Sequence, residues 1–230
     1  MPDIALRSGD RVGPYELDLG SKLVREFAEA TCDDNRQVQC GDLVPPGLVA
    51  TQSYRAQFAA IKTLVPEEVF STARSGVHGQ HDLVVYRPLS STETLHTFVD
   101  SHSARPSGDN LRVTLHHATF DNRDLLVAEQ WWSTVLLGIT AEPSGPELPD
   151  YSFSSEGGAV VAEDVVRIDE VMARRYAQVS ADYSDHHFTV EGASAAALRL
   201  HFFMDFVRWH YAFAPQPRQW PAVTHGESAE

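Results

Sequence analysis

The chain has 230 residues, of which 43% are hydrophobic and 22% are charged, a composition typical of a globular protein with a sizeable core. Its formal net charge of −14 argues against a nucleic-acid partner and against anionic membrane surfaces, because both need a basic face. The N-terminal sequence lacks the basic and apolar regions of a secretion signal, and the two cysteines form no CxxC motif. We therefore expect a cytoplasmic protein with two reduced thiols.

Two segments of the chain resemble each other at a fixed offset of 149 residues. Each copy, residues 15–35 and residues 164–184, predicts a short extended run, a helix and then a polar loop that contains an aspartate. The agreement extends to side-chain chemistry at several aligned positions: Leu19 with Ile168, Arg25 with Arg174, Phe27 with Tyr176, Ala28 with Ala177, Thr31 with Ser180, and Asp33 with Asp182. The repeat predicts two related units in one chain.

After the first copy, the pattern predicts one α+β unit. A helix should begin near Pro46 or Gly47, because proline suits the first turn of a helix. Strand-like segments follow, with Gly, Pro, Asn and Asp in the turns between them. They cover residues 81–89, 94–104, 110–120 and 125–138. Helices followed by an antiparallel meander predict a sheet with the helices packed on one face.

The second copy begins like the first but is shorter. Residues 141–158 are rich in Pro, Gly and Ser and predict a linker, so the expected boundaries are 1–140 for the N-terminal unit and 159–230 for the C-terminal unit. After His187 the chain holds one helical stretch and a tail interrupted by prolines. There is no room for a second complete meander, and we expect the C-terminal unit to be incomplete.

The polar loop of the second copy carries the best candidates for catalysis. Asp182 and His187 lie just after a predicted helix, so a loop can turn both side chains toward one point. Addition of water to a double bond needs one group to take a proton from the water and another to deliver a proton to carbon, and an Asp–His pair on one water can do both. On the loop alone, two solvated surface residues remain the competing interpretation.

This loop resembles the hydratase motif of MaoC-like and R-specific enoyl-CoA hydratases, which reads Ser-Gly-Asp-x-Asn-Pro-x-His. Ser180, Asp182 and His187 match the motif in identity and spacing, whereas Ser184 replaces the Asn. The resemblance implies an α+β hot-dog fold, in which an antiparallel sheet wraps around a helix. It also implies that Asp182 and His187 hold the catalytic water and that Ser184 supports them.

The first copy resembles the degenerate N-terminal half of double hot-dog hydratases. The resemblance rests on residues 27–35, 44–47 and 86–89, and it covers the chain from residue 10 to about residue 190. At the offset of His187 this half has Val38, so it lacks the imidazole. The resemblance implies that the N-terminal half is not catalytic and holds the acyl chain of the substrate.

The family's His-Gly-Leu segment, which opens its central helix and supplies a backbone N–H to the thioester carbonyl, is missing beyond His187. Residues 201–210 occupy the corresponding place, and an out-of-frame translation around Met204 and Asp205 permits the missing segment. One hypothesis is a frameshift near residues 192–195. The other is a natural C-terminus that a partner subunit completes.

The resemblance therefore implies reversible hydration of an enoyl thioester, with coenzyme A or phosphopantetheine as part of the substrate and no metal or redox cofactor. Two alternatives stay open: a non-catalytic acyl-binding subunit of a hetero-oligomeric hydratase, and a hot-dog thioesterase. We expect a homodimer or a hetero-oligomer with another hot-dog subunit, since open sheet edges need pairing.

Two pairs of histidines outside the loop invite a metal interpretation. Adjacent residues of a strand point to opposite faces, which argues against a site at His116 and His117. His78 and His81 have neither Cys nor carboxylate partners at metal-binding spacing, so no metal site is predicted.

Overall fold

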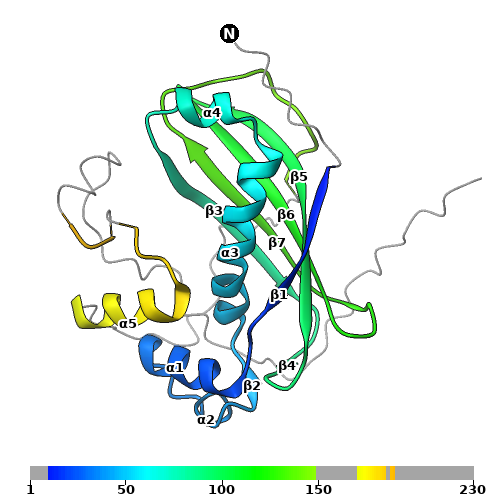
Figure 1. The fold of residues 1–230 in the computed structure, drawn as a ribbon, viewed down its shortest axis with the longest axis vertical. Coiled ribbons are helices and arrows are strands. Elements are labelled where there is room, and N and C mark those ends of the chain that lie inside the picture. Colours follow the sequence, from blue (N-terminus) through cyan, green and yellow to red (C-terminus); the bar gives the residue numbers. More distant parts are fainter. Residues whose placement is uncertain (1–9, 149–169, 185–186, 190–230) are drawn as a thin grey trace, which may run out of the picture.

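The structure is a computed structural model, and it describes residues 10–148, 170–184 and 187–189 (Figure 1). The elements in chain order are β1 (Arg11–Leu17), α1 (Ser21–Thr31), α2 (Arg36–Gln39), β2 (Leu43–Val44), α3 (Pro46–Leu64), α4 (Glu67–Thr72), β3 (Gly76–Val85), β4 (Leu89–Ser90), β5 (Leu95–Ser107), β6 (Asn110–Phe120), β7 (Leu126–Leu136) and α5 (Glu170–Ser180).

A five-stranded antiparallel sheet with the order β1-β5-β6-β7-β3 forms the body of the molecule. The long helix α3 lies against one face of this sheet, and α1 and α5 lie side by side near the N-terminal end of α3 (Figure 1). The predicted α+β class and the helix beginning at Pro46 are confirmed. The helix ends before Pro66, since the residue that precedes a proline is disfavoured in the helical region.

The first predicted strand is wrong at both ends. It was expected to cover residues 81–89, but β3 runs from Gly76 to Val85. Pro88 lacks an N–H group and cannot donate to a sheet ladder, which explains why the strand stops before it. The three other predicted strands correspond to β5, β6 and β7, and β6 has the predicted bounds.

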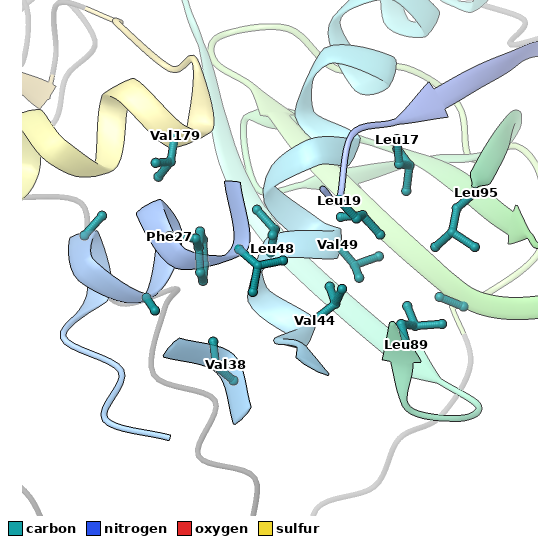
Figure 2. Packing of buried hydrophobic residues seen from close by; sticks show 14 of the residues in the cluster. Leu17, Leu19, Phe27, Val38, Val44, Leu48, Val49, Leu89, Leu95 and Val179 are labelled. Atoms are coloured by element: carbon teal, nitrogen blue, oxygen red, sulfur yellow. The ribbon is translucent and has the colours of Figure 1, made fainter. Parts of the chain in front are cut away.

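Apolar side chains form two clusters, one at each end of α3. The first joins α1, the beginning of α3, the small β2–β4 ribbon and α5; in Figure 2, Val179 of α5 lies with Phe27 of α1 and Leu48 of α3. The second fills the space between the C-terminal half of α3 and the sheet. Because α5 contributes to the first cluster, hydrophobic burial ties the second copy of the repeat to the N-terminal unit.

The repeat predicted from the sequence is present in the local structure. Helices α1 and α5 have 11 residues each, and their first and last residues are related by the same offset as the sequence repeat. Each helix is followed by a residue with positive φ, 53° at Cys32 and 59° at Ala181. The rings of Phe27 and Tyr176, which occupy equivalent positions, pack against each other with centroids 6.2 Å apart.

The two loops that follow these helices also share a hydrogen bond. The backbone N–H two positions beyond the aspartate donates to its Oδ1, from Asn35 to Asp33 at 2.9 Å and from Ser184 to Asp182 at 3.1 Å. The sequence therefore builds the same helix-to-aspartate turn twice.

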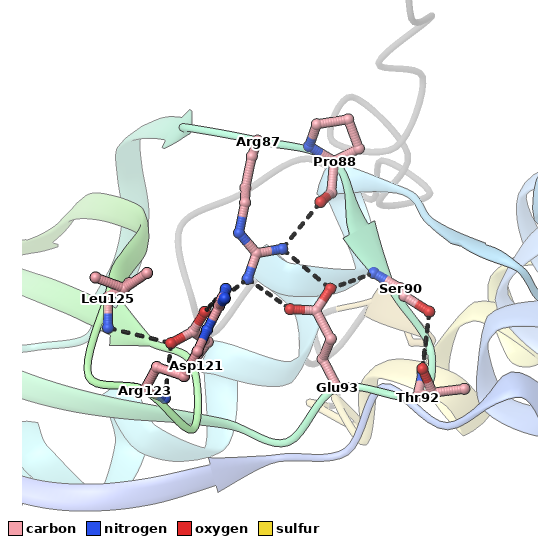
Figure 3. A network of polar contacts seen from close by, with 8 residues as sticks. All are labelled: Arg87, Pro88, Ser90, Thr92, Glu93, Asp121, Arg123 and Leu125. Atoms are coloured by element: carbon pink, nitrogen blue, oxygen red, sulfur yellow. Dashed lines mark hydrogen bonds and ion pairs between the residues drawn. The ribbon is translucent and has the colours of Figure 1, made fainter.

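An arginine fastens the loops at one end of the sheet (Figure 3). Arg87, between β3 and β4, donates through Nη1 to Glu93 at 3.0 Å and through Nη2 to Asp121 at 3.0 Å. Asp121 also accepts the backbone N–H groups of Arg123 and Leu125 in the β6–β7 turn. The network joins two loops that are distant in sequence.

The beginning of the predicted linker packs on the N-terminal unit. Ser144 pairs with Ala104 of β5 in an antiparallel bridge, and Arg105 donates to the carbonyl of Gly145 at 2.8 Å. Residues 149–158 of the predicted linker lie outside the described residues, as do most of the predicted C-terminal unit and the region of the frameshift hypothesis. No helix in the described part of the chain is long and apolar enough to cross a membrane.

Candidate active site

The structure brings the two predicted catalytic side chains together. Nε2 of His187 lies 3.3 Å from Oδ2 of Asp182. Both residues are buried, with exposed fractions of 8% for Asp182 and 9% for His187. The competing interpretation, two solvated surface residues, is therefore wrong for this pair.

Ser184 completes the hydrogen bonds of the Asp182 carboxylate. Its hydroxyl donates to Oδ1 at 2.6 Å, in addition to the bond from its backbone N–H. Burial by itself would raise the pKa of Asp182, but the hydrogen bonds from His187 and Ser184 outweigh this effect and hold that pKa below its usual range. The carboxylate is therefore ionised at neutral pH and can accept a proton.

A small cavity opens beside the pair. It has a volume of about 10 Å³, and its lining consists of Ala173, Tyr176, Ala177, Asp182, His187 and Phe188. This volume is close to the least space that one water molecule needs. Two polar side chains on an otherwise largely apolar wall can orient a single water.

The N-terminal unit anchors the helix that carries this loop. The hydroxyls of Thr51, on α3, and Tyr176, on α5, share a hydrogen bond of 3.1 Å. One residue further along α3, Nε2 of Gln52 donates to the backbone carbonyl of Val179 at 3.2 Å. Because Val179 lies three residues before Asp182, these bonds fix the end of α5 from which the loop departs.

Two neighbours of Asp182 were missed in the sequence. Burial raises the pKa of the Tyr54 hydroxyl, on α3, above its ordinary value, and the negative charge of Asp182 acts in the same direction. His78 of β3 is close enough to Asp182 to feel its charge, although burial lowers the pKa of His78 to about 4. The sequence holds no signal for either contact, because more than a hundred residues separate each of them from the loop.

A bulge in β3 places His78 beside Trp132. The register shifts between His78 and Gln80, so that the strand accommodates Gly79 as an extra residue. The rings of His78 and Trp132 stack with centroids 4.7 Å apart. The ring of Tyr54, on α3, has its centroid 5.8 Å from that of Trp132, on β7. These rings therefore form an aromatic layer between α3 and the sheet.

Further buried polar side chains lie between α3 and the sheet. His81 hydrogen-bonds to Gln130 at 2.9 Å, and His117 hydrogen-bonds to Gln57 at 2.8 Å. Burial lowers the pKa of each of these two histidines to about 3, so both imidazoles are neutral. In the described part of the chain, no three His, Cys, Asp or Glu side chains are grouped so that they could hold a metal ion.

The prediction that adjacent histidines of β6 face opposite sides is confirmed. His117 points to α3, whereas His116 points to the other face of the sheet, where it contacts Glu129 at 2.9 Å and Asp100 at 3.8 Å. In the loop of the first copy, Val38 is fully buried in the apolar core. The equivalent of His187 is thus a packing residue, and the first loop lacks the pair.

The chain matches no family model, and no curated protein resembles it at a significant level. Several solved structures do resemble it. A MaoC-like dehydratase from Phytophthora capsici superposes with a TM-score of 0.67 and 16% identity over 85% of this chain and 70% of the other. HtdX of Mycobacterium tuberculosis gives a TM-score of 0.57 and 19% identity over 86% and 70%.

A third similar structure is that of HadBC, a 3R-hydroxyacyl-ACP dehydratase complex of Mycobacterium tuberculosis. It matches with a TM-score of 0.50 and 16% identity over 58% of this chain and 98% of the other. At these identities the likeness concerns the fold. The predicted hot-dog fold is confirmed: the chain shares the fold of MaoC-like dehydratases.

Proposed function

We propose that the chain catalyses the reversible hydration of a 2-enoyl thioester to a 3-hydroxyacyl thioester. The observation that supports this most directly is the buried Asp182–His187 pair beside a cavity of one water's size. Buried carboxylates are rare unless they have partners or a function. The Asp182 carboxylate is both buried and ionised, so it can act as a proton acceptor.

In the proposed reaction, Asp182 and His187 hold the attacking water. The ionised Asp182 accepts one proton from the water while the water's oxygen bonds to the β-carbon of the enoyl group. The protonated Asp182 then delivers a proton to the α-carbon, which regenerates the carboxylate. Nε2 of His187 faces the carboxylate, so Asp182 orients the imidazole. Dehydration follows the same path in reverse.

The substrate that fits this proposal is an acyl thioester of coenzyme A or of an acyl carrier protein. The hot-dog fold is shared with MaoC-like dehydratases, and HadBC is described as a 3R-hydroxyacyl-ACP dehydratase. We propose that the N-terminal unit holds the acyl chain and that the reaction needs neither a metal nor a redox cofactor.

The test is the hydration of crotonyl-CoA and of a longer enoyl-CoA, followed as the loss of the conjugated thioester absorbance. Asp182→Asn and His187→Gln should each lower kcat at least a hundredfold, since the first removes the proton acceptor and the second removes a group that holds the attacking water. A parallel assay for free thiol separates hydration from thioester hydrolysis. Release of thiol without formation of the hydroxyacyl product would show a thioesterase instead.

A second candidate is a hydratase subunit that works only with a partner. The likeness to HadBC, a complex, favours it, because the match covers 98% of that chain. Native mass measurements would show whether this chain assembles with itself. A monodisperse homodimer that hydrates enoyl-CoA would exclude the need for a different subunit.

A further inference from the structure

A layer of buried polar side chains lies between α3 and the sheet and separates the two apolar clusters (Figure 1). On β5, Thr97 stands between Leu95 of the first cluster and Val99 of the second. We call this group the polar layer. All its members are at most 3% exposed, and they are Ser53 and Gln57 on α3, Thr97 on β5, His117 and Thr119 on β6, and Gln130 on β7.

Hydrogen bonds close the polar layer from helix to sheet. Nε2 of His117 lies 2.8 Å from Oε1 of Gln57. Nε2 of Gln130 donates to Oγ of Ser53 at 2.7 Å, and its Oε1 lies 2.9 Å from Nε2 of His81 on β3. The hydroxyls of Thr97 and Thr119 share a bond of 2.8 Å. Each member of the layer therefore has a polar partner away from water.

The polar layer begins close to the candidate active site. Tyr176 lines the cavity and belongs to the first apolar cluster, and its hydroxyl bonds to Thr51 of α3. Ser53 and Gln57 follow Thr51 by two and six residues, which corresponds to about 3 Å and about 9 Å along the helix axis. An acyl chain that follows α3 from the cavity into the N-terminal unit therefore meets the layer after a few carbons.

Crossing the polar layer would cost more affinity than a longer chain gains. Each further methylene that leaves water gains about fourfold in affinity. Each buried polar group that is left without a partner loses roughly 5- to 150-fold. Separating His117 from Gln57 and Gln130 from Ser53 leaves four such groups, so the loss exceeds the gain from about four methylenes.

We propose that the polar layer stops the acyl chain, so that the substrate is a short-chain 2-enoyl thioester. The inference rests on the proposed hydratase function and on the N-terminal unit as the part that holds the acyl chain. It adds that only the first apolar cluster, on the near side of the layer, receives this chain. The second apolar cluster belongs to the core of the protein alone.

The first test is a chain-length series with the full wild-type chain. The kcat/KM values for hydration are measured with crotonyl-CoA, 2-hexenoyl-CoA, 2-octenoyl-CoA and 2-decenoyl-CoA. The value for 2-decenoyl-CoA should lie at least about tenfold below that for 2-hexenoyl-CoA, because the longer chain gains no buried surface beyond the layer. A kcat/KM that rises steadily up to 2-decenoyl-CoA would overturn the inference.

A double variant tests the layer itself. Gln57→Ala combined with His117→Leu removes both partners of one bond, so neither is left unpaired. It should raise the ratio of kcat/KM for 2-decenoyl-CoA over crotonyl-CoA about tenfold. The matched control is Thr114→Val combined with Ser133→Ala, which removes a buried bond of 2.7 Å on the opposite face of the sheet. Its ratio should equal that of the wild type, and an equal rise in both double variants would contradict the proposal.

A binding series gives a readout that does not depend on activity. Calorimetry measures the Kd of butyryl-CoA, hexanoyl-CoA and decanoyl-CoA, which have no double bond to hydrate. Decanoyl-CoA should bind the wild type no more tightly than hexanoyl-CoA, and more tightly than hexanoyl-CoA in Gln57→Ala with His117→Leu. A wild-type Kd that falls about fourfold per methylene up to decanoyl-CoA would overturn the inference. If the wild type binds these thioesters but hydrates no enoyl-CoA, the proposed function fails, and the Kd series still decides the role of the polar layer.

Discussion

At Asp182, burial and hydrogen bonding act on the carboxylate in opposite directions. Burial favours the neutral acid, whereas the donors on Ser184 and His187 favour the ion, and the donors prevail. The result is a charged base in a mostly apolar place, where electrostatic interactions are stronger than in water. A surface aspartate of the same loop would have neither the orientation nor the isolation that the proposed chemistry uses.

The side chain of Ser184 is expected to contribute measurably to this balance. Ser184→Ala removes the 2.6 Å hydrogen bond to Oδ1 and keeps the backbone donor. We expect kcat to fall about tenfold and the acidic limb of the pH profile to move up, because hydrogen bonds to a charged group are worth about 1.5–3 kcal/mol. Kinetics across the pH range check this, with Ser107→Ala at the exposed end of β5 as the control. Equal pH profiles for both variants would contradict it.

At the scale of elements, α3 has two functions. Its sheet-facing side packs on the strands through Ala56, Ala60, Ile61 and Leu64. Its first turns contact α5 through Thr51 and Gln52, and the helix thereby links the core of the N-terminal unit to the loop of the second copy. The apolar side of α3 therefore packs on the sheet, and its polar residues Thr51 and Gln52 bind α5.

Weakening this link should loosen α5 more than it destabilises the whole protein. Gln52→Leu removes the donor to the Val179 carbonyl and preserves side-chain volume approximately. We expect faster amide hydrogen exchange in residues 176–184, while amides of β6 exchange as in the wild type, because local opening costs less than global unfolding. Gln37→Leu on the exposed face of α2 is the control. Unchanged exchange around α5 in Gln52→Leu would show that apolar packing alone holds the helix.

Much of this element arrangement was predictable from the sequence, for identifiable reasons. The repeat could be found because Asp33 and Asp182 follow helices with the same pattern, and β6 because turn residues bound a run rich in strand-forming side chains. Pro88 also carries a signal for the end of β3, because proline cannot donate a hydrogen bond in a sheet ladder. The places of Tyr54 and His78 could not be found, because tertiary packing against Trp132 and the bulge at Gly79 set them.

The stability of the whole molecule should depend on its buried imidazoles. Burial lowers the pKa of His78 to about 4 and those of His81 and His117 to about 3. In the unfolded chain these groups titrate near 6.5, so below that pH the unfolded state binds more protons than the folded state. Their contribution to stability is therefore lost as the pH falls from about 6.5 toward the folded pKa values.

One histidine acts in the opposite sense. Burial alone would lower the pKa of His116, but Asp100 and Glu129 raise it, so its contribution is present below about pH 6.5 and is lost as the pH rises. Since the effect of three imidazoles opposes that of one, the net free energy of unfolding should fall by roughly 5 kcal/mol between about pH 7 and about pH 5.

Denaturant unfolding at these two pH values measures the difference, and His116→Gln isolates the opposing group. The variant should lose more stability at about pH 6 than at about pH 8.5, because only the protonated imidazole bonds to both carboxylates as a donor. A wild-type protein equally stable at about pH 5 and about pH 7 would show that the three buried histidines accept protons without opening the core.

The molecule as a whole uses one helix-to-aspartate turn for two purposes. In the first copy the turn ends in Val38 and supports the core, and in the second it ends in His187 and faces a cavity. The copies pack on each other through Phe27 and Tyr176. At equivalent positions, Val38 belongs to the apolar core in the first copy, whereas His187 belongs to the candidate catalytic pair in the second.

The most direct test of the proposed chemistry is to run the reaction in heavy-oxygen water. We predict that crotonyl-CoA incubated with the chain gains the heavy oxygen at the β-hydroxyl of the product, and that Asp182→Asn abolishes this gain. Mass spectrometry of the intact thioester locates the label. Heavy oxygen in a free carboxylic acid, or equal labelling by the wild type and Asp182→Asn, would contradict the claim that this pair adds water to a double bond.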